Sequence, residues 1–289
     1  MADSERHSRL SRLVGEPDLT ETVSVDRVVS AVAAYGMWGL TIGIVVFLWL
    51  PLTQIVVLSF MENSTVLFPF EGVTLDNYVA LFTNDGLLLA ARQSAFVATT
   101  AATVATLLGV PLGFAIARHD FTGRGVLRGL VIVPLLMPGI IMGISLLILF
   151  RVVDLSPGFV GTVLAHSVYG LPFIVLPVVA RLAVFDRKLE EGARDLGATG
   201  REVVRDVTLP IISPAIAAGF VFAWLRSFED FIRVFFVGGT MDALTKEMYG
   251  MVVYSQGTEA MDPMATIIVL VVSAALAVAI NFRDILEYV

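Results

Sequence analysis

Cysteine is absent from this 289-residue sequence, and charged residues make up only 16% of it. The absence of cysteine excludes disulfides, thiolate metal sites and a cysteine nucleophile. The three histidines, His7, His119 and His166, lie far apart in the sequence, so no pair has metal-ligand spacing. We therefore expect neither a metal site nor a catalytic residue. A net charge of -7 argues against nucleic acid as a partner and is compatible with a halophilic source.

Hydrophobic residues account for 57% of the chain, and its mean hydropathy is +0.85. They fall in long uncharged runs, and a helical run of about 20 apolar residues can cross the bilayer core. Six runs qualify: residues 28–61, 93–117, 129–150, 155–180, 207–225 and 263–282. The sequence thus predicts an all-α integral membrane protein with six transmembrane helices, the first near residues 36–60.

Several of these runs contain proline, notably the third, at Pro134 and Pro138, and the fourth, at Pro172 and Pro177. Neighbouring helices in a membrane bundle can satisfy the backbone groups that a proline leaves free. These positions therefore indicate either kinked helices around a pathway or close helix packing.

Lys and Arg are distributed unevenly between the two sides of the predicted bundle. With the N-terminus in the cytoplasm, 14 lie inside and five outside, the five being Arg92, Arg151, Arg226, Arg233 and Lys246. The positive-inside rule then predicts that both termini are cytoplasmic. Residues 1–27 are predicted to form a polar cytoplasmic tail and residues 28–289 the transmembrane domain, with external loops at 62–92 and about 238–262.

The cytoplasmic loop at about 181–208 is charged and amphipathic. We predict a helix over residues 181–196, ended by Gly197, and a second helix capped by Thr199 with Glu202 in a capping box. The first helix has an apolar stripe of Leu182, Val184, Phe185, Leu189, Ala193 and Leu196. Such an element is either a docking surface for another protein or a helical pair lying on lipid headgroups.

The same loop resembles the signature loop of ATP-binding-cassette (ABC) importer permeases. That family pattern is Glu-Ala-Ala, three residues, Gly, nine residues, Ile, one residue and Leu-Pro. It matches in spacing, with Gly192 in place of the first Ala and Val207 in place of Ile. The resemblance implies a type I ABC importer permease-like bundle. It also implies that the ATP-binding subunit is contacted through Glu191, Gly192, Ala193, Gly197, Leu209 and Pro210.

The partners implied by this resemblance are an ATP-binding subunit in two copies, a homologous second permease subunit, an external substrate-binding protein and the lipid bilayer. The sequence has no Gly-x-x-x-x-Gly-Lys-[Ser/Thr] phosphate loop. We therefore expect no cofactor on this chain, with ATP and magnesium used by the ATP-binding subunit. The expected location is a prokaryotic cell membrane.

Residues 189–198, 227–231 and 137–147 resemble more narrowly the spermidine/putrescine importer permeases, specifically the second of their two paired subunits. The likeness extends from about residue 30 to 282 and implies a polyamine cargo. An importer for iron, thiamine or a phosphonate is the alternative within the class. A secondary transporter that needs no ATP is the alternative outside it, and inverted repeats would mark it.

Four charged residues lie just after the fifth run: Arg226, Glu229, Asp230 and Arg233. Charges at the edge of the bilayer are costly and usually have a reason. Glu229 and Asp230 are candidate pathway residues, because carboxylates attract the ammonium groups of a polyamine. Alternatively, Arg226 pairs with Asp230 and Glu229 with Arg233, each four residues apart, and the cluster neutralises itself. His166 is predicted to be a hydrogen-bonded packing residue.

Overall fold

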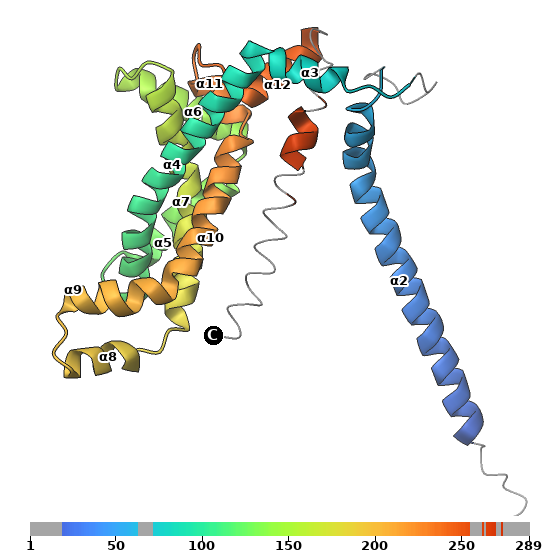
Figure 1. The fold of residues 1–289 in the computed structure, drawn as a ribbon. Helices are drawn as coiled ribbons and strands as arrows, with labels where there is room; N and C mark the ends of the chain where they lie inside the picture. The colour runs from blue at the N-terminus through green and yellow to red at the C-terminus, as the bar shows by residue number, and fades with distance from the viewer. Residues whose placement is uncertain (1–18, 63–71, 255–261, 263, 270–272, 274–289) are drawn as a thin grey trace, which may run out of the picture. The chain divides into compact units, whose positions relative to one another are not determined.

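The computed structural model describes residues 19–62, 72–254, 262, 264–269 and 273. Helix is the main structure of these residues, apart from one β-bridge between Met61 and Val73. The chain divides into two units, residues 1–58 and residues 59–289. Figure 1 shows the helices of both units.

The first unit is represented by helix α2, Leu19–Leu58, which contains Pro51. Its apolar part, Val32–Leu58, is long enough to cross a membrane. The hydroxyls of Thr41 and Thr53 donate to the carbonyls of Met37 and Trp49, at 2.8 and 2.9 Å. These bonds satisfy the two threonine hydroxyls within the apolar part of the helix. The helix begins at Leu19, within the segment predicted to be a polar tail.

The second unit contains the remaining described helices. They are α3 (Asp76–Thr83), α4 (Asp85–Arg118), α5 (Arg124–Leu136), α6 (Gly139–Val152), α7 (Phe159–Ala183), α8 (Lys188–Asp195), α9 (Gly200–Glu202), the π-helix η1 (Val203–Thr208), α10 (Leu209–Phe228), α11 (Ile232–Val237) and α12 (Leu244–Tyr254). Helix α4 begins earlier than the predicted residue 93, because the Asn84 side chain caps it by accepting from the Leu87 N–H at 2.9 Å.

Four helical segments of the described residues are long and apolar enough to be spans: Val32–Leu58, Asp85–Arg118, Phe159–Ala183 and Gly200–Phe228. The predicted third run is broken, since α5 and α6 meet at an angle of 112°. Pro138 lies at this break, where its ring disfavours a helical conformation of Met137. The pair is a fifth span if it crosses as one unit. Most of the sixth run lies outside the described residues, so six spans and two cytoplasmic termini stay predictions.

Helices α4, α7 and α10 pack together and form the core of the second unit. Ala102, Ala105, Ile174, Ile212 and Ala223 are buried where they meet. Small residues allow these helices to approach closely: a Cβ atom on Gly219 would lie 2.6 Å from the carbonyl oxygen of Phe173. Close approach through small residues is the usual way in which membrane helices associate.

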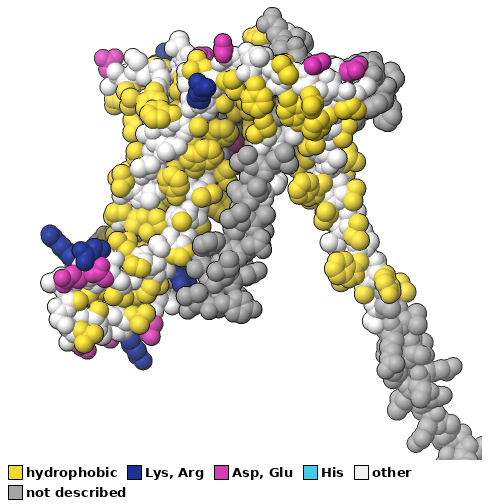
Figure 2. Space-filling view, in the orientation of Figure 1, with side chains coloured by type: hydrophobic (Ala, Val, Ile, Leu, Met, Phe, Trp, Pro, Cys, Tyr) yellow, Lys and Arg dark blue, Asp and Glu magenta, His cyan; other side chains and the backbone are white. Residues whose placement is uncertain are grey.

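Polar and apolar side chains separate along this helical bundle. Figure 2 shows hydrophobic side chains over the middle of α4 and α10, and charged side chains gathered at the two ends. Helices α8 and α9 lie at one end, and α3, α11 and α12 lie at the other (Figure 1). The loops that were predicted on opposite sides of the membrane therefore lie at opposite ends of the bundle.

Candidate functional site

Residues 181–196 form two separate helical pieces, the end of α7 and the helix α8, rather than the predicted continuous helix. Helix α7 extends to Ala183, and α8 begins only at Lys188. The carboxylate of Asp186 accepts a hydrogen bond from the Lys188 backbone N–H at 3.0 Å, which stabilises a turn between them. The predicted continuity was wrong because this side chain competes locally for the backbone.

The end of α8 and the start of the next helix follow the prediction. Gly197 has φ +93, a left-handed conformation that glycine adopts without strain, and it terminates α8. Thr199 and Glu202 form the predicted capping box, in which the Thr199 N–H donates to Glu202 Oε2 at 2.7 Å. Helix α9 then continues through η1 into α10.

The six predicted coupling residues lie in two places. Glu191, Gly192 and Gly197 are exposed on α8 and its end, and Ala193 is half-buried there. Leu209 and Pro210 form the first turn of α10, where Leu209 packs against the bundle core. The first group therefore lies on α8 and its end, and the second lies on α10, beyond the turn at Gly197.

The apolar stripe of this loop divides into an anchored part and an exposed part. Leu182 and Phe185 are buried against the bundle, whereas Val184, Leu189 and Leu196 are 75%, 52% and 92% exposed. Large apolar side chains that stay exposed on one short loop favour a surface that another molecule covers. The arrangement suits docking of a partner at this end of the bundle.

Glu190, which the sequence did not single out, is the carboxylate that ties α8 to the bundle. Its Oε1 atom accepts from Arg118 Nη2 at 3.0 Å and from the Thr208 hydroxyl at 2.8 Å. Glu190 and Arg118 side chains are only 13% and 11% exposed. The guanidinium of Arg118 also lies 4.9 Å from the ring centre of Phe185. Because Arg118 and Glu190 are 72 residues apart, no local pattern could have paired them.

At the other end of the bundle, both predicted ion pairs were wrong in their partners. Arg233 pairs with Asp230, and Arg226 pairs with Glu229. Helix α10 ends at Phe228 and α11 begins at Ile232, so the intervening residues are not helical and four-residue spacing no longer brings side chains together. The two arginines still balance the two carboxylates.

The Asp230–Arg233 pair is buried, with side chains 4% and 7% exposed. The backbone N–H of Arg233 donates to Asp230 Oδ1 at 3.0 Å. Its guanidinium lies 3.5 Å from the ring centre of Tyr169, a close cation–π contact. Asp230 is therefore held in place by Arg233, three residues further along the chain.

His166 was predicted to be a hydrogen-bonded packing residue, and its 2.6 Å contact with the Ser227 hydroxyl confirms this. The other ring nitrogen, Nε2, lies 3.9 Å from Asp230 Oδ2 and has no hydrogen-bond partner among the described residues. The tertiary structure thus adds His166 and Tyr169 to the cluster.

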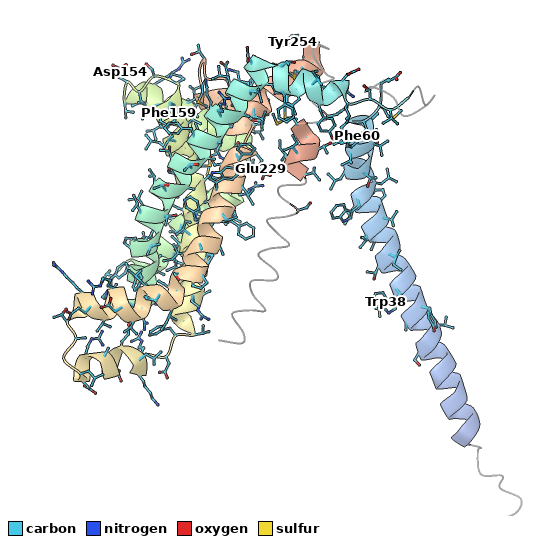
Figure 3. All side chains as sticks on the ribbon, viewed as in Figure 1. Trp38, Phe60, Asp154, Phe159, Glu229 and Tyr254 are labelled. Carbon is cyan, nitrogen blue, oxygen red and sulfur yellow. The ribbon has the colours of Figure 1, made fainter. Side chains whose placement is uncertain are left out.

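Glu229 differs from Asp230 in its exposure. It follows the last residue of α10, where Figure 3 labels it, and its side chain is 56% exposed. Arg226, its partner, is 44% exposed and donates to the Tyr169 hydroxyl at 2.8 Å. Of the two predicted pathway carboxylates, Glu229 is the accessible one.

A pocket of about 540 Å³ lies near this cluster and is lined by residues that include Phe235, Glu247, Tyr249 and Tyr254. The ammonium group of Lys246, which also lines it, donates to the carbonyls of Gly239 and Met241. The pocket adjoins the charged cluster: the Phe231 ring lies 4.8 Å from Tyr249, and the Thr245 hydroxyl donates to the Asp230 carbonyl at 3.3 Å.

Residues 109–288 match the family described as "Binding-protein-dependent transport system inner membrane component". The chain belongs to this family of membrane-spanning transport components. It is 35% identical over 242 residues to the spermidine/putrescine transport system permease protein PotC of Escherichia coli (strain K12), covering 83% of this chain and 90% of that protein. The importer-permease resemblance of the sequence is thereby confirmed.

Two further relatives differ in the cargo that their names give. The putrescine transport system permease protein PotI of Escherichia coli (strain K12) is 32% identical, covering 67% of this chain and 71% of that protein. The molybdate/tungstate transport system permease protein WtpB of Pyrococcus furiosus (strain ATCC 43587 / DSM 3638 / JCM 8422 / Vc1) is also 32% identical, covering 86% and 94%.

Two solved structures share the fold. A bacterial ABC transporter that imports the acidic polysaccharide alginate has a TM-score of 0.66 at 14% identity, covering 88% of this chain and 96% of that chain. The MetNI methionine ABC transporter in an inward-facing conformation has a TM-score of 0.55 at 18% identity, covering 68% and 94%. At these identities the likeness concerns the fold alone.

Proposed function

We propose that this chain is the permease subunit of an ABC importer for polyamines, spermidine or putrescine, in a prokaryotic cell membrane. The observation that carries the cargo is the 35% identity to PotC over 90% of that protein's length. In this proposal residues 28–289 form the permease domain and residues 1–27 a cytoplasmic tail.

Coupling to ATP is proposed to occur at α8. The exposed Leu189 and Leu196, together with Glu191 and Gly197, form a surface at the end of the bundle to which an ATP-binding subunit can dock. Two such subunits would hydrolyse ATP with magnesium, and this chain would bind no cofactor. A homologous second permease and an external binding protein complete the proposed assembly. Alternating access then requires that nucleotide and substrate bind the two states with different affinity.

The substrate-facing part of the proposal concerns the opposite end. Glu229 is accessible and carries a negative charge, and a polyamine ammonium needs anionic or aromatic partners. The neighbouring pocket offers the aromatic rings of Phe235, Tyr249 and Tyr254 and the Glu247 carboxylate. Asp230 is already paired with Arg233, so it contributes to a passage only if that pair opens.

Uptake by cells tests the cargo. Cells lacking this gene are compared with cells that carry the intact chain, using labelled spermidine and labelled putrescine. We expect uptake to disappear in the first and return in the second. Unchanged polyamine uptake would contradict the polyamine proposal and leave family membership intact.

The second candidate is an importer of an oxyanion, and iron, thiamine and a phosphonate stay alternatives within the class. The similarity to WtpB favours the oxyanion, as does the half-exposed guanidinium of Arg226 beside the candidate pathway. Guanidinium groups bind oxyanions through paired hydrogen bonds. Molybdate uptake measured in the same two strains distinguishes this candidate from the polyamine importer.

A further inference from the structure

Glu190 connects three elements at the end of the bundle that holds the loop. It lies on α8, it pairs with Arg118 at the last residue of α4, and it accepts from Thr208 at the last residue of η1. One oxygen atom, Oε1, accepts both bonds, at 3.0 and 2.8 Å. The exposed helix α8 is therefore joined to two different spans, α4 and α10, through a single carboxylate.

The burial of this junction sets it apart from other charges at the same end. Arg118 and Glu190 are 11% and 13% exposed, whereas Asp120, which pairs with Arg124, is 95% exposed. Exposed ion pairs contribute little because water and salt screen them. If a buried charged pair is broken, each partner becomes a desolvated charge without compensation. Separation of Arg118 from Glu190 is therefore much more costly than separation of an exposed pair.

The element next to Glu190 is an irregular part of the helix that leads into α10. Residues Val203–Thr208 form a π-helix, a rare arrangement that is often found at functional sites. The Thr208 hydroxyl also contacts the Val203 carbonyl, at 3.3 Å, within the same π-helix. A displacement of α8 would thus act on η1 through Thr208 and on α4 through Arg118.

We propose that Glu190 is a positioning residue that transmits movement of the coupling loop to the bundle, through Arg118 to α4 and through Thr208 to α10. Glu191 on the outer side of α8 would meet the ATP-binding subunit, and Glu190 on the inner side would carry the displacement inward. This inference rests on the proposed function as an ATP-driven permease. The two adjacent glutamates therefore have different roles: Glu191 contacts the ATP-binding subunit, and Glu190 positions α8 against the bundle.

The test uses the full complex, with its ATP-binding subunits, partner permease and external binding protein, reconstituted in lipid vesicles. Two quantities are measured: stimulation of ATP hydrolysis by the binding protein, and spermidine imported per ATP hydrolysed. Glu190→Gln keeps the shape of the side chain and removes its charge. We expect the complex to assemble with lower thermal stability, because Arg118 keeps a buried charge, and both quantities to fall about fivefold or more.

Three comparisons sharpen this test. Arg118→Gln should behave like Glu190→Gln, and the reversed pair Arg118→Glu with Glu190→Arg should recover part of the stimulation, because the Thr208 hydroxyl can accept as well as donate. Asp120→Asn, at the same end of α4 but on an exposed pair, should leave both quantities unchanged.

The outcomes separate the inference from the function on which it rests. If Glu190→Gln retains full stimulation, or if it loses the ATP-binding subunit on purification, the positioning role is wrong. If the wild-type complex imports no spermidine but the binding protein still stimulates hydrolysis, the cargo is wrong and the stimulation still tests Glu190. If the wild-type chain transports with no ATP-binding subunit, the ATP-driven function and this inference both fail.

Discussion

Glu229 and Asp230 are neighbours in the sequence, yet their environments are opposite. Asp230 is buried against Arg233 and Tyr169, whereas more than half of the Glu229 side chain is exposed. The environment of each carboxylate follows from the end of α10 at Phe228, which turns the two side chains in different directions. Substitutions at these two positions therefore test structure and transport separately.

We expect Asp230→Asn to destabilise the protein by about 3–5 kcal/mol, because Arg233 would keep a buried charge without a charged partner. Glu229→Gln should change stability by less than about 1 kcal/mol, since that pair is exposed. Thermal unfolding of the purified protein in lipid nanodiscs measures both. If Asp230→Asn keeps wild-type stability and still abolishes uptake, Asp230 contacts the substrate instead.

Two glycines of the coupling loop are expected to respond oppositely to alanine. Gly192 is exposed within α8, and no atom of the described residues lies within 4 Å of an added Cβ, so Gly192→Ala should stabilise this helix by about 1 kcal/mol. Gly197 has φ +93, so Gly197→Ala should cost about 1–2 kcal/mol. Hydrogen exchange of the α8 amides compares the two variants, and equal protection in both would contradict this expectation.

At the scale of the elements, the approach of α7 and α10 depends on Gly219. A Cβ there would lie 2.6 Å from the Phe173 carbonyl oxygen and 3.1 Å from Ile174 Cα. Both are backbone atoms, so a rotamer change cannot relieve the clash. The two helices would have to separate along their shared core.

We therefore predict that Gly219→Val costs about 1–3 kcal/mol or more through overpacking. Gly129→Val is the matched control, because Gly129 is exposed on α5 and no described atom lies within 4 Å of its added Cβ. Thermal unfolding in detergent and the fraction of monodisperse protein measure the effect. Equal losses in the two variants would show that valine in a helix, rather than the α7–α10 contact, is responsible.

At the scale of the whole molecule, the proposed assembly depends on a surface that the bundle does not need for its own folding. Glu191 is exposed on α8 and takes part in no ion pair among the described residues. Glu191→Lys should therefore leave the bundle folded while repelling or displacing the ATP-binding subunit. Co-purification of that subunit measures the effect, with Asp120→Lys at the same end as the control.

Retention of the ATP-binding subunit by Glu191→Lys would remove Glu191 from the docking surface. Normal transport by the chain without any ATP-binding subunit would instead favour a secondary transporter. The two results are separate, because the first concerns one residue and the second concerns the energy source of the whole assembly.

Much of the architecture could be predicted from the sequence. Long apolar runs predicted α2, α4, α7 and α10, because the transfer of apolar side chains out of water depends mainly on local composition. The capping box at Thr199 and the helix end at Gly197 were also predicted, since both depend on residues within one turn. The family followed from the spacing of residues in one loop.

Only the tertiary structure decided which charges meet. It joined Arg118 to Glu190 across 72 residues, placed His166 beside Asp230, and exchanged the partners of Arg226 and Arg233. Local free energies determine where helices form. Ion-pair partners and the burial of each carboxylate depend on how α4, α7 and α10 pack, and no single run contains that information.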